Sequence, residues 1–404
     1  MVYECPIGAL ASRRGCHFVE GGQPFYVHGF NAYFLMAISV DLPSRSKSVE
    51  LLEEAAASGF NVGRTWAFND GGYQALQISP GVYDENVFQA LDFVLNQARR
   101  SGLYLILTLV NNWGDYGGKA KYVEWARMAS SDIKSEDDFF SDPTAKGFYR
   151  NHIKTVLTRV NSITGIRYKD DPTIFAWELI NEPQCSKDPS GEMLQAWIEE
   201  MAAYLKSIDC NHLLGLGSEG FYGPSNPGRV MENPNDYALQ VGTDFLRNHN
   251  VEAIDFAGAH GYPDSWLGPG EKVAQQIVFI ENWLSAHIAD CTSILKKPFL
   301  FGEFGVSSKS TSFKPEQRVS LLSSIYTVLY ISALGKGAAA GGLLWQLFPK
   351  GMENFNDGYQ LVLSEDEAVA QLVKRHAERL ADLTGSAYGK PKGGICPTIR
   401  FKCW

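Results

Sequence analysis

The sequence predicts an α/β protein built as a single (β/α)8 barrel, or TIM barrel, with loop elaborations. Short continuous apolar runs alternate with longer amphipathic segments along the chain, and this alternation occurs eight times. Continuous apolar strands flanked by helices are typical of a parallel sheet that is covered by helices. No Gly-x-Gly-x-x-Gly turn follows the first run, which favours a closed barrel over an open doubly wound sheet.

The expected strands are the eight apolar runs, at residues 25–30, 61–66, 103–110, 174–179, 213–217, 256–260, 299–304 and 342–347. Helical periodicity marks the segments between and after them, at residues 48–58, 85–100, 143–161, 192–208, 271–290, 315–334 and 366–383. Only a weak helix, at residues 237–247, is expected between the fifth and sixth strands, because this interval is rich in Gly, Pro and Asn.

The chain is expected to form one catalytic domain over residues 1–404, with its barrel core at about residues 18–383. Residues 111–142 and 219–250 are interpreted as loop elaborations, since neither is bounded by a low-complexity linker. Residues 384–404 form a C-terminal extension whose role the sequence does not indicate.

The composition of the chain indicates which classes of molecule it is suited to bind. The chain has 404 residues, of which 45% are hydrophobic, and a formal net charge of −9. An acidic chain without a lysine-rich run favours a neutral substrate over nucleic acid. No stretch reaches the roughly 20 apolar residues that a membrane helix needs, and the first residues do not read as a signal peptide. If the protein is exported, this is its mature form, and no membrane partner is expected.

The seven cysteines form no C-x-x-C pair and no His/Cys cluster at zinc spacing, so neither a metal site nor a cofactor is expected. Those near the chain ends are Cys5, Cys16, Cys396 and Cys403. They are either disulfides that fasten the termini, which would indicate an oxidising compartment, or free thiols.

Polar side chains stand where the expected strands end. In a (β/α)8 barrel the carboxyl ends of all strands meet at one face, where the active site lies. These strand ends carry Arg64, Trp66, Asn111, Trp113, Asn181, Glu182, His260, Tyr262, Glu303 and Trp345. We therefore expect two glutamates, a cation and several aromatic rings to converge on one mouth.

Glu182 and Glu303 end the fourth and seventh strands, which lie across the barrel from each other. A retaining glycosidase needs two carboxyl groups about 5–5.5 Å apart, one as nucleophile and one as acid/base. Arg64 and Tyr262 are positioned to favour the ionised form of Glu303. Asn181 is a candidate donor to a sugar 2-hydroxyl.

The tryptophans divide into platforms and core. Trp345 is the candidate floor under the reacting sugar, with Trp66, Trp113, Trp125 and Trp266 as further platforms, whereas Trp177 and Trp197 fall inside a strand and a helix and are assigned to packing. Glu178 is a rival acid only if the strand register is shifted.

These residues also carry a family resemblance. The segments "HGFNAYFLM", "RTWAFND", "NNWGDYGGK", "YKDDPTIFAWELINEPQC", "HGYPDSWL" and "GLLWQL", together with Glu303-Phe-Gly305, resemble the endo-β-1,4-mannanases of glycoside hydrolase family 5, in particular the plant branch. The likeness extends from about residue 18 to about residue 383. It implies a secreted, metal-independent enzyme that cleaves mannan, glucomannan or galactomannan with retention, using Glu182 as acid/base and Glu303 as nucleophile.

Other functions remain open from the residues alone. The same carboxyl pair serves a cellulase or a mannan transglycosylase, because residue chemistry does not distinguish an axial from an equatorial 2-hydroxyl. A non-catalytic carbohydrate-binding barrel is disfavoured, since a binder has no need of both glutamates.

Overall fold

A computed structural model of the chain describes residue 7 and residues 9–129, 132–268, 270–309, 313–352 and 357–384. Its central sheet has eight parallel strands, in the order β10-β9-β8-β5-β4-β13-β12-β11. The strands are β4 (Val27–Asn31), β5 (Val62–Trp66), β8 (Tyr104–Thr108), β9 (Ile174–Glu178), β10 (Leu213–Gly215), β11 (Ala257–Gly261), β12 (Phe299–Phe304) and β13 (Ala339–Leu344).

The sheet curls until its edge strands β10 and β11 approach each other. Two backbone hydrogen bonds join the segments at these edges. Asp255 N donates to the Leu214 carbonyl oxygen, and His260 N donates to the Glu219 carbonyl oxygen. Where β13 meets β4, the left-handed Gly341 (φ 128°) has no room for a side chain, since a Cβ there would lie 1.9 Å from the Val27 carbonyl oxygen. The predicted (β/α)8 barrel is therefore confirmed.

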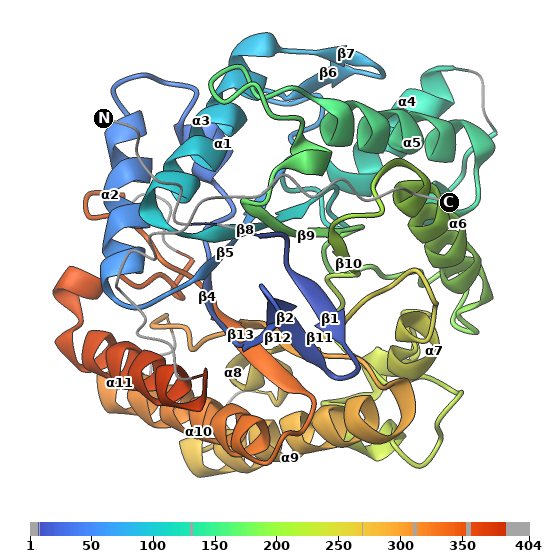
Figure 1. Ribbon diagram of the computed structural model, residues 1–404. Helices are drawn as coiled ribbons and strands as arrows, with labels where there is room; N and C mark the ends of the chain where they lie inside the picture. Colours follow the sequence, from blue (N-terminus) through green and yellow to red (C-terminus); the bar gives the residue numbers. More distant parts are fainter. Residues whose placement is uncertain are drawn as a thin grey trace.

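Helices ring the barrel, one after each strand (Figure 1). They are α2 (Arg45–Ala57), α3 (Glu85–Ser101), α5 (Pro143–Thr158), α6 (Glu192–Ile208), α7 (Phe245–His249), α9 (Val273–Asp290), α10 (Pro315–Leu334) and α11 (Glu367–Thr384). α3 illustrates the local rules. Asp84 caps its first turn, Gly102 ends it in a left-handed conformation, and Val87, Leu91 and Ala98 face the core.

The unit after β10 has the shortest of these helices. α7 covers five residues and follows the 3-10 turn η4 (Asp236–Leu239), so the weak helix expected at residues 237–247 is partly displaced. The connection after β8 holds α4 (Gly118–Met128) and the 3-10 turn η1 (Glu136–Phe140). Further short elements are α1 (Leu35–Ile38), α8 (Pro263–Trp266), β6 (Gln77–Ser79) and β7 (Val82–Tyr83).

A small antiparallel sheet closes the amino-terminal end of the barrel. It consists of β1 (Ser12–Arg14), β2 (His17–Glu20) and β3 (Gln23–Phe25), and in Figure 1 β1 and β2 lie over the centre of the ring of strands. Phe18 is buried in edge-to-face contact with Phe175 and Phe256. The expected first strand, residues 25–30, was wrong at its start, because Phe25 belongs to β3. With this end filled by apolar side chains, the site lies at the other end.

Two other predictions were wrong in detail. The last strand is displaced toward the amino terminus of the chain, ending at Leu344, so Trp345 follows it. Trp125 is no platform: it lies on α4, is 7% exposed and packs edge-to-face on Tyr122. Trp177 and Trp197 are buried as predicted. Of the four cysteines near the chain ends, Cys16 has a free thiol, and the other three, Cys5, Cys396 and Cys403, lie outside the described residues. The structure also does not describe residues 385–404 of the C-terminal extension.

No helix among the described residues is long and apolar enough to cross a membrane.

Candidate active site

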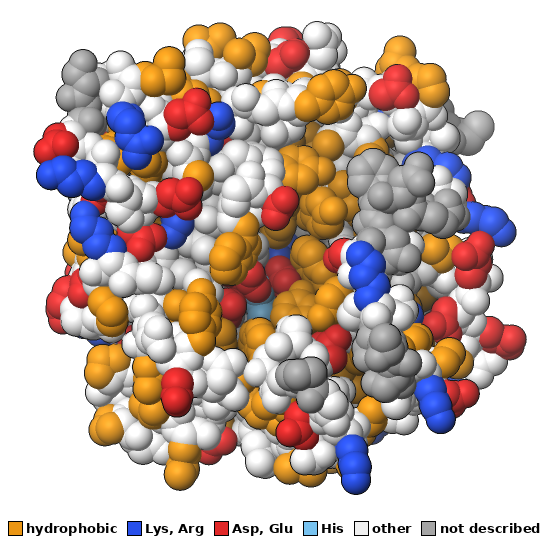
Figure 2. Space-filling view, turned by 180° about the vertical axis from the view of Figure 1, so that it is seen from behind, with side chains coloured by type: hydrophobic (Ala, Val, Ile, Leu, Met, Phe, Trp, Pro, Cys, Tyr) orange, Lys and Arg blue, Asp and Glu red, His pale blue; other side chains and the backbone are white. Residues whose placement is uncertain are grey.

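A cleft of about 480 Å³ opens at the carboxyl end of the strands. Figure 2 shows it as a hollow with acidic side chains and a histidine at its floor and apolar side chains around its rim. It is lined by Tyr33, Trp66, Asn111, Trp113, Asp115, Tyr116, Asn181, Glu182, Tyr262, Ser265, Glu303, Trp345, Asp357 and Tyr359.

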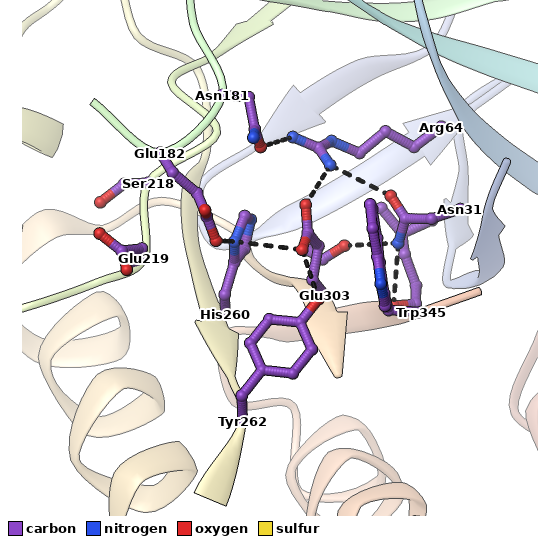
Figure 3. Close-up of polar contacts among 12 residues, drawn as sticks. Asn31, Arg64, Asn181, Glu182, Ser218, Glu219, His260, Tyr262, Glu303 and Trp345 are labelled. Carbon is purple, nitrogen blue, oxygen red and sulfur yellow. Dashed lines mark hydrogen bonds and ion pairs between the residues drawn. The ribbon is translucent and has the colours of Figure 1, made fainter. Parts of the chain in front are cut away.

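Glu182 and Glu303 face each other in this cleft (Figure 3). An oxygen of each carboxyl group and a ring nitrogen of His260 all lie within 4.8 Å of one another. Glu303 belongs to β12, whereas Glu182 follows β9 in a left-handed backbone conformation (φ 49°). The distance is compatible with the spacing of about 5–5.5 Å between the carboxyl groups of a retaining glycosidase.

Arg64 lies beneath the carboxyl pair and is fully buried. Its Nη1 contacts Glu303 Oε1 at 2.6 Å and its Nη2 donates to Asn181 Oδ1 at 2.8 Å. On the opposite edge, its Nε donates to Glu178 Oε2 at 2.7 Å. Glu178 also accepts from Thr108, so this glutamate is a buried partner of the guanidinium and does not line the cleft.

Tyr262 and His260 hold the two carboxyl groups from the β11 side. The Tyr262 hydroxyl donates to Glu303 Oε2 at 2.5 Å. His260 Nδ1 lies 2.6 Å from Glu182 Oε1 and 3.6 Å from Glu303 Oε2. The imidazole therefore contacts both carboxyl groups.

Burial acts on both carboxyl groups, with different outcomes. It raises the pKa of Glu303 above its ordinary value, although the charges of His260 and Arg64 oppose it. Burial also disfavours ionisation of Glu182, but the hydrogen bond and charge of His260, together with a hydrogen bond from Trp113, hold its pKa below the ordinary value. The expectation that Arg64 and Tyr262 favour ionised Glu303 is therefore right in direction for each contact, but burial outweighs both contacts.

The aromatic rings take several positions. Trp345 lines the cleft and stacks on Tyr33, with ring centres 5.8 Å apart. Trp66 lies on the same wall with the Arg64 guanidinium over its ring. Trp266 does not line the cleft, since it packs between Tyr262 and Trp283 at its edge.

Asn181 and Asn111 join the ends of β9 and β8. Asn181 Nδ2 donates to Asn111 Oδ1 at 3.0 Å, and the two residues form an isolated parallel bridge. This bond uses one of the two hydrogens of the Asn181 amide group, and its predicted contact with a sugar hydroxyl would use the other.

Several site residues were not predicted. Asn31 ends β4 and accepts from Arg64 Nη1 at 3.1 Å, and reading the first strand one residue further would have identified it by the same strand-end rule. Glu219 lies buried near Glu182 (Figure 3), and burial raises its pKa well above the ordinary value. No sequence signal marks Tyr33, Tyr116, Asp357 or Tyr359 as cleft residues, because loops carry them.

The atoms of Glu182, His260 and Glu303 are spaced closely enough to hold a cation. However, Glu182 is bonded to His260 and Trp113, and Glu303 to Arg64 and Tyr262. Each of the four carboxyl oxygens thus already has a partner within the protein, and the expected independence of metal ions stays a prediction.

Comparisons with known proteins agree with this geometry. A family model described as "GH family 5 beta-mannosidase-like" matches residues 9–347. The chain is 49% identical to mannan endo-1,4-beta-mannosidase 1 of Oryza sativa subsp. japonica, covering 93% of this chain and 87% of the relative. It is 48% identical to mannan endo-1,4-beta-mannosidase 7 of Arabidopsis thaliana, covering 93% and 86%.

Solved structures show the same fold. An endo-1,4-beta-mannanase from Rhizomucor miehei is 30% identical with a TM-score of 0.76, covering 93% of this chain and 100% of that chain. An endo-beta-1,4-mannanase from Thermotoga petrophila is 28% identical with a TM-score of 0.77, covering 92% and 81%. On the family match and these identities, the chain belongs to the β-mannosidase-like group of glycoside hydrolase family 5.

Proposed function

We propose that the protein is an endo-β-1,4-mannanase that hydrolyses internal bonds of mannan, glucomannan and galactomannan with retention of configuration. The observation that carries the proposal is the carboxyl pair within 4.8 Å at the barrel mouth. The relatives and solved structures named as mannan endo-1,4-beta-mannosidases and mannanases support the choice of substrate.

In the first step, Glu303 attacks the anomeric carbon while Glu182 protonates the departing oxygen. The reactive form therefore carries a proton on Glu182 and a charge on Glu303, the reverse of the order that the two pKa directions give in the structure. Arg64 touches Glu303 directly, so the charge left on Glu303 in this form is the one that is paired with a permanent cation. In the second step, Glu182 takes a proton from water, and the oxygen of that water displaces Glu303 from the sugar.

The other polar residues position these two. Tyr262 and Arg64 each bind one oxygen of Glu303, which fixes the direction from which it attacks. Asn181 supplies the hydrogen bond to the 2-hydroxyl that strengthens in the transition state. Trp345, backed by Tyr33, provides the floor on which the reacting sugar stacks.

The expected location is extracellular. Cys210 is disulfide-bonded, and disulfides persist in oxidising compartments, which supports secretion.

Product analysis tests the substrate. Purified enzyme is incubated with mannan, glucomannan and carboxymethyl cellulose side by side, and products are separated by size. Mixed manno-oligosaccharides from mannan are expected from the earliest times. Turnover of cellulose without turnover of mannan would make the protein a cellulase. In a separate incubation with a manno-oligosaccharide, products longer than that oligosaccharide would make it a transglycosylase.

The roles of the two glutamates are tested separately. A 2-fluoromannosyl inactivator is expected to label the peptide that contains Glu303. Glu182→Ala is expected to slow mannan hydrolysis by about two orders of magnitude or more and to form the glycosyl-enzyme readily from a dinitrophenyl β-mannoside. Azide should then release a β-mannosyl azide. An α-azide, or label on Glu182, would refute the assignment.

A further inference from the structure

Glu182 is held by two nitrogen donors on opposite sides. Buried His260 approaches its Oε1, and the indole Nε1 of Trp113 donates to its Oε2 at 2.6 Å. Trp113 is 40% exposed and lines the cleft. The indole thus contacts the Glu182 oxygen that His260 does not contact.

The backbone around this contact is fixed. Asn112 N donates to the Asn181 carbonyl at 3.0 Å, and Trp113 N donates to Asn111 Oδ1 at 3.2 Å. Gly118 packs so closely that a Cβ on it would lie 2.1 Å from the Trp113 carbonyl oxygen. Trp113 and Glu182 therefore follow two strands, β8 and β9, whose ends are hydrogen-bonded to each other. The fold thus fixes the position of the indole beside the carboxyl group.

An indole N–H only donates, and a hydrogen bond to an ionised acceptor is stronger than one to a neutral acceptor. The contact therefore favours the carboxylate form of Glu182. The ionisable groups around it are Arg64, Glu219, His260, Tyr262 and Glu303. Of these, Glu303 changes charge during the reaction itself.

The two steps make opposite demands on Glu182. Before the first step, the negative charge of Glu303 favours a proton on Glu182. Once Glu303 carries the sugar, that charge is gone, and Glu182 must be a carboxylate to accept a proton. The indole N–H acts in the direction that the second step needs.

We propose that Trp113 is a positioning residue for the second step, in which its indole N–H holds Glu182 as the carboxylate base. The water oxygen bonds to the anomeric carbon, the bond to Glu303 breaks with its electron pair returning to Glu303, and the water proton passes to Glu182. This inference rests on the proposed function and adds to it a residue predicted from sequence only as a stacking platform.

The second step is measured alone by trapping the enzyme with a 2-fluoromannosyl inactivator, removing the excess and following the return of activity across pH. Trp113→Phe keeps an aromatic ring and removes the N–H. Its reactivation at the acid end is expected to be slower by about tenfold, the factor that a hydrogen bond to a charged group contributes. The acid limb of its pH profile is expected at higher pH than in the parent.

Two comparisons separate this role from stacking or damage. Azide needs no base, so reactivation of Trp113→Phe by azide should match the parent, and the rate of inactivation should change by no more than about twofold, because an activated leaving group needs no acid. Trp266→Phe makes the same chemical change beside the cleft without touching Glu182, and its acid limb should stay in place.

An unmoved acid limb in Trp113→Phe, or an equal shift in Trp266→Phe, would overturn the inference. So would slow reactivation that azide does not relieve, since that result indicates lost stacking. Failure of the proposed function is distinct from these outcomes: the inactivator would then label neither the parent nor the variants, and azide would not rescue Glu182→Ala.

Discussion

Replacing Arg64 by lysine tests whether the buried guanidinium holds the nucleophile in place. The guanidinium makes contacts along two edges, to Glu178 on one and to Glu303 and Asn181 on the other. Lysine keeps the charge but offers its donors from one point. An ammonium group at this position pairs with one of the two glutamates and leaves the other alone.

The size of the effect follows from burial. Arg64, Glu178 and Glu303 are all at most 3% exposed, and breaking a buried ion pair by removing one partner costs about 3–5 kcal/mol. We expect a loss of stability of about this size in Arg64→Lys. Because Glu303 also loses the contact that orients it, kcat on mannan should fall by about two orders of magnitude.

Thermal melts and initial rates on mannan measure the two effects, and Arg159→Lys is the matched control. Arg159 makes a two-pronged contact with buried Asp92 on the outside of the barrel, so its replacement should lower stability and leave kcat unchanged. Adding Glu178→Gln to Arg64→Lys frees the ammonium for Glu303 and should restore stability more than activity. Parental stability and kcat in Arg64→Lys would refute the reasoning.

Three further predictions concern pH, metal ions and stacking. Burial raises the pKa of Asp70 to about 8, so the folded protein keeps a proton that the unfolded chain releases near pH 4. The free energy of unfolding should therefore fall as pH rises between about 4 and 8. In thermal melts over this interval, the stability of Asp70→Asn relative to the parent should increase with pH. Parallel plots of melting temperature against pH for the two proteins would contradict the assignment. Dialysis against EDTA should leave mannan hydrolysis unchanged, and a loss that a divalent cation restores would show that Glu182, His260 and Glu303 hold an ion. Trp345→Ala should lower kcat strongly, because stacking orients the reacting sugar, and Trp266→Ala, which reaches the site through Tyr262, should have the smaller effect. The reverse order would move the cleavage point toward Trp266.

The sequence predicted the barrel and most of its polar floor for one physical reason. Parallel strands that are buried on both faces must be apolar along their length, so a charged or amide side chain at the end of such a run stands out. Arg64, Asn181 and Glu303 were found in this way and do contact one another. The rule missed Asn31, where the end of the first strand was misread.

Loops were harder to predict, because their conformations depend on contacts that no periodicity records. Trp113 was predicted as a cleft residue, but its hydrogen bond to Glu182 depends on the turn after β8 and on the bridge between Asn111 and Asn181. Trp125 and Trp266 have the same residue type and follow expected strands, yet one is buried in α4 and the other packs behind Tyr262. Tertiary packing therefore decides whether such a tryptophan faces the cleft.

The two ends of the barrel affect the stability of the folded protein in opposite directions. At the mouth, the carboxyl groups of Glu178 and Glu303 are buried against the guanidinium of Arg64, and burying charge is costly even when it is paired. At the other end, β2 and β3 fill the barrel with apolar side chains such as Phe18 and Phe25, which pack on Phe175 and Tyr104. Each such ring contributes stability roughly in proportion to the apolar area it removes from water. The apolar cluster that the small sheet completes therefore contributes stability against the cost of the charges buried at the mouth.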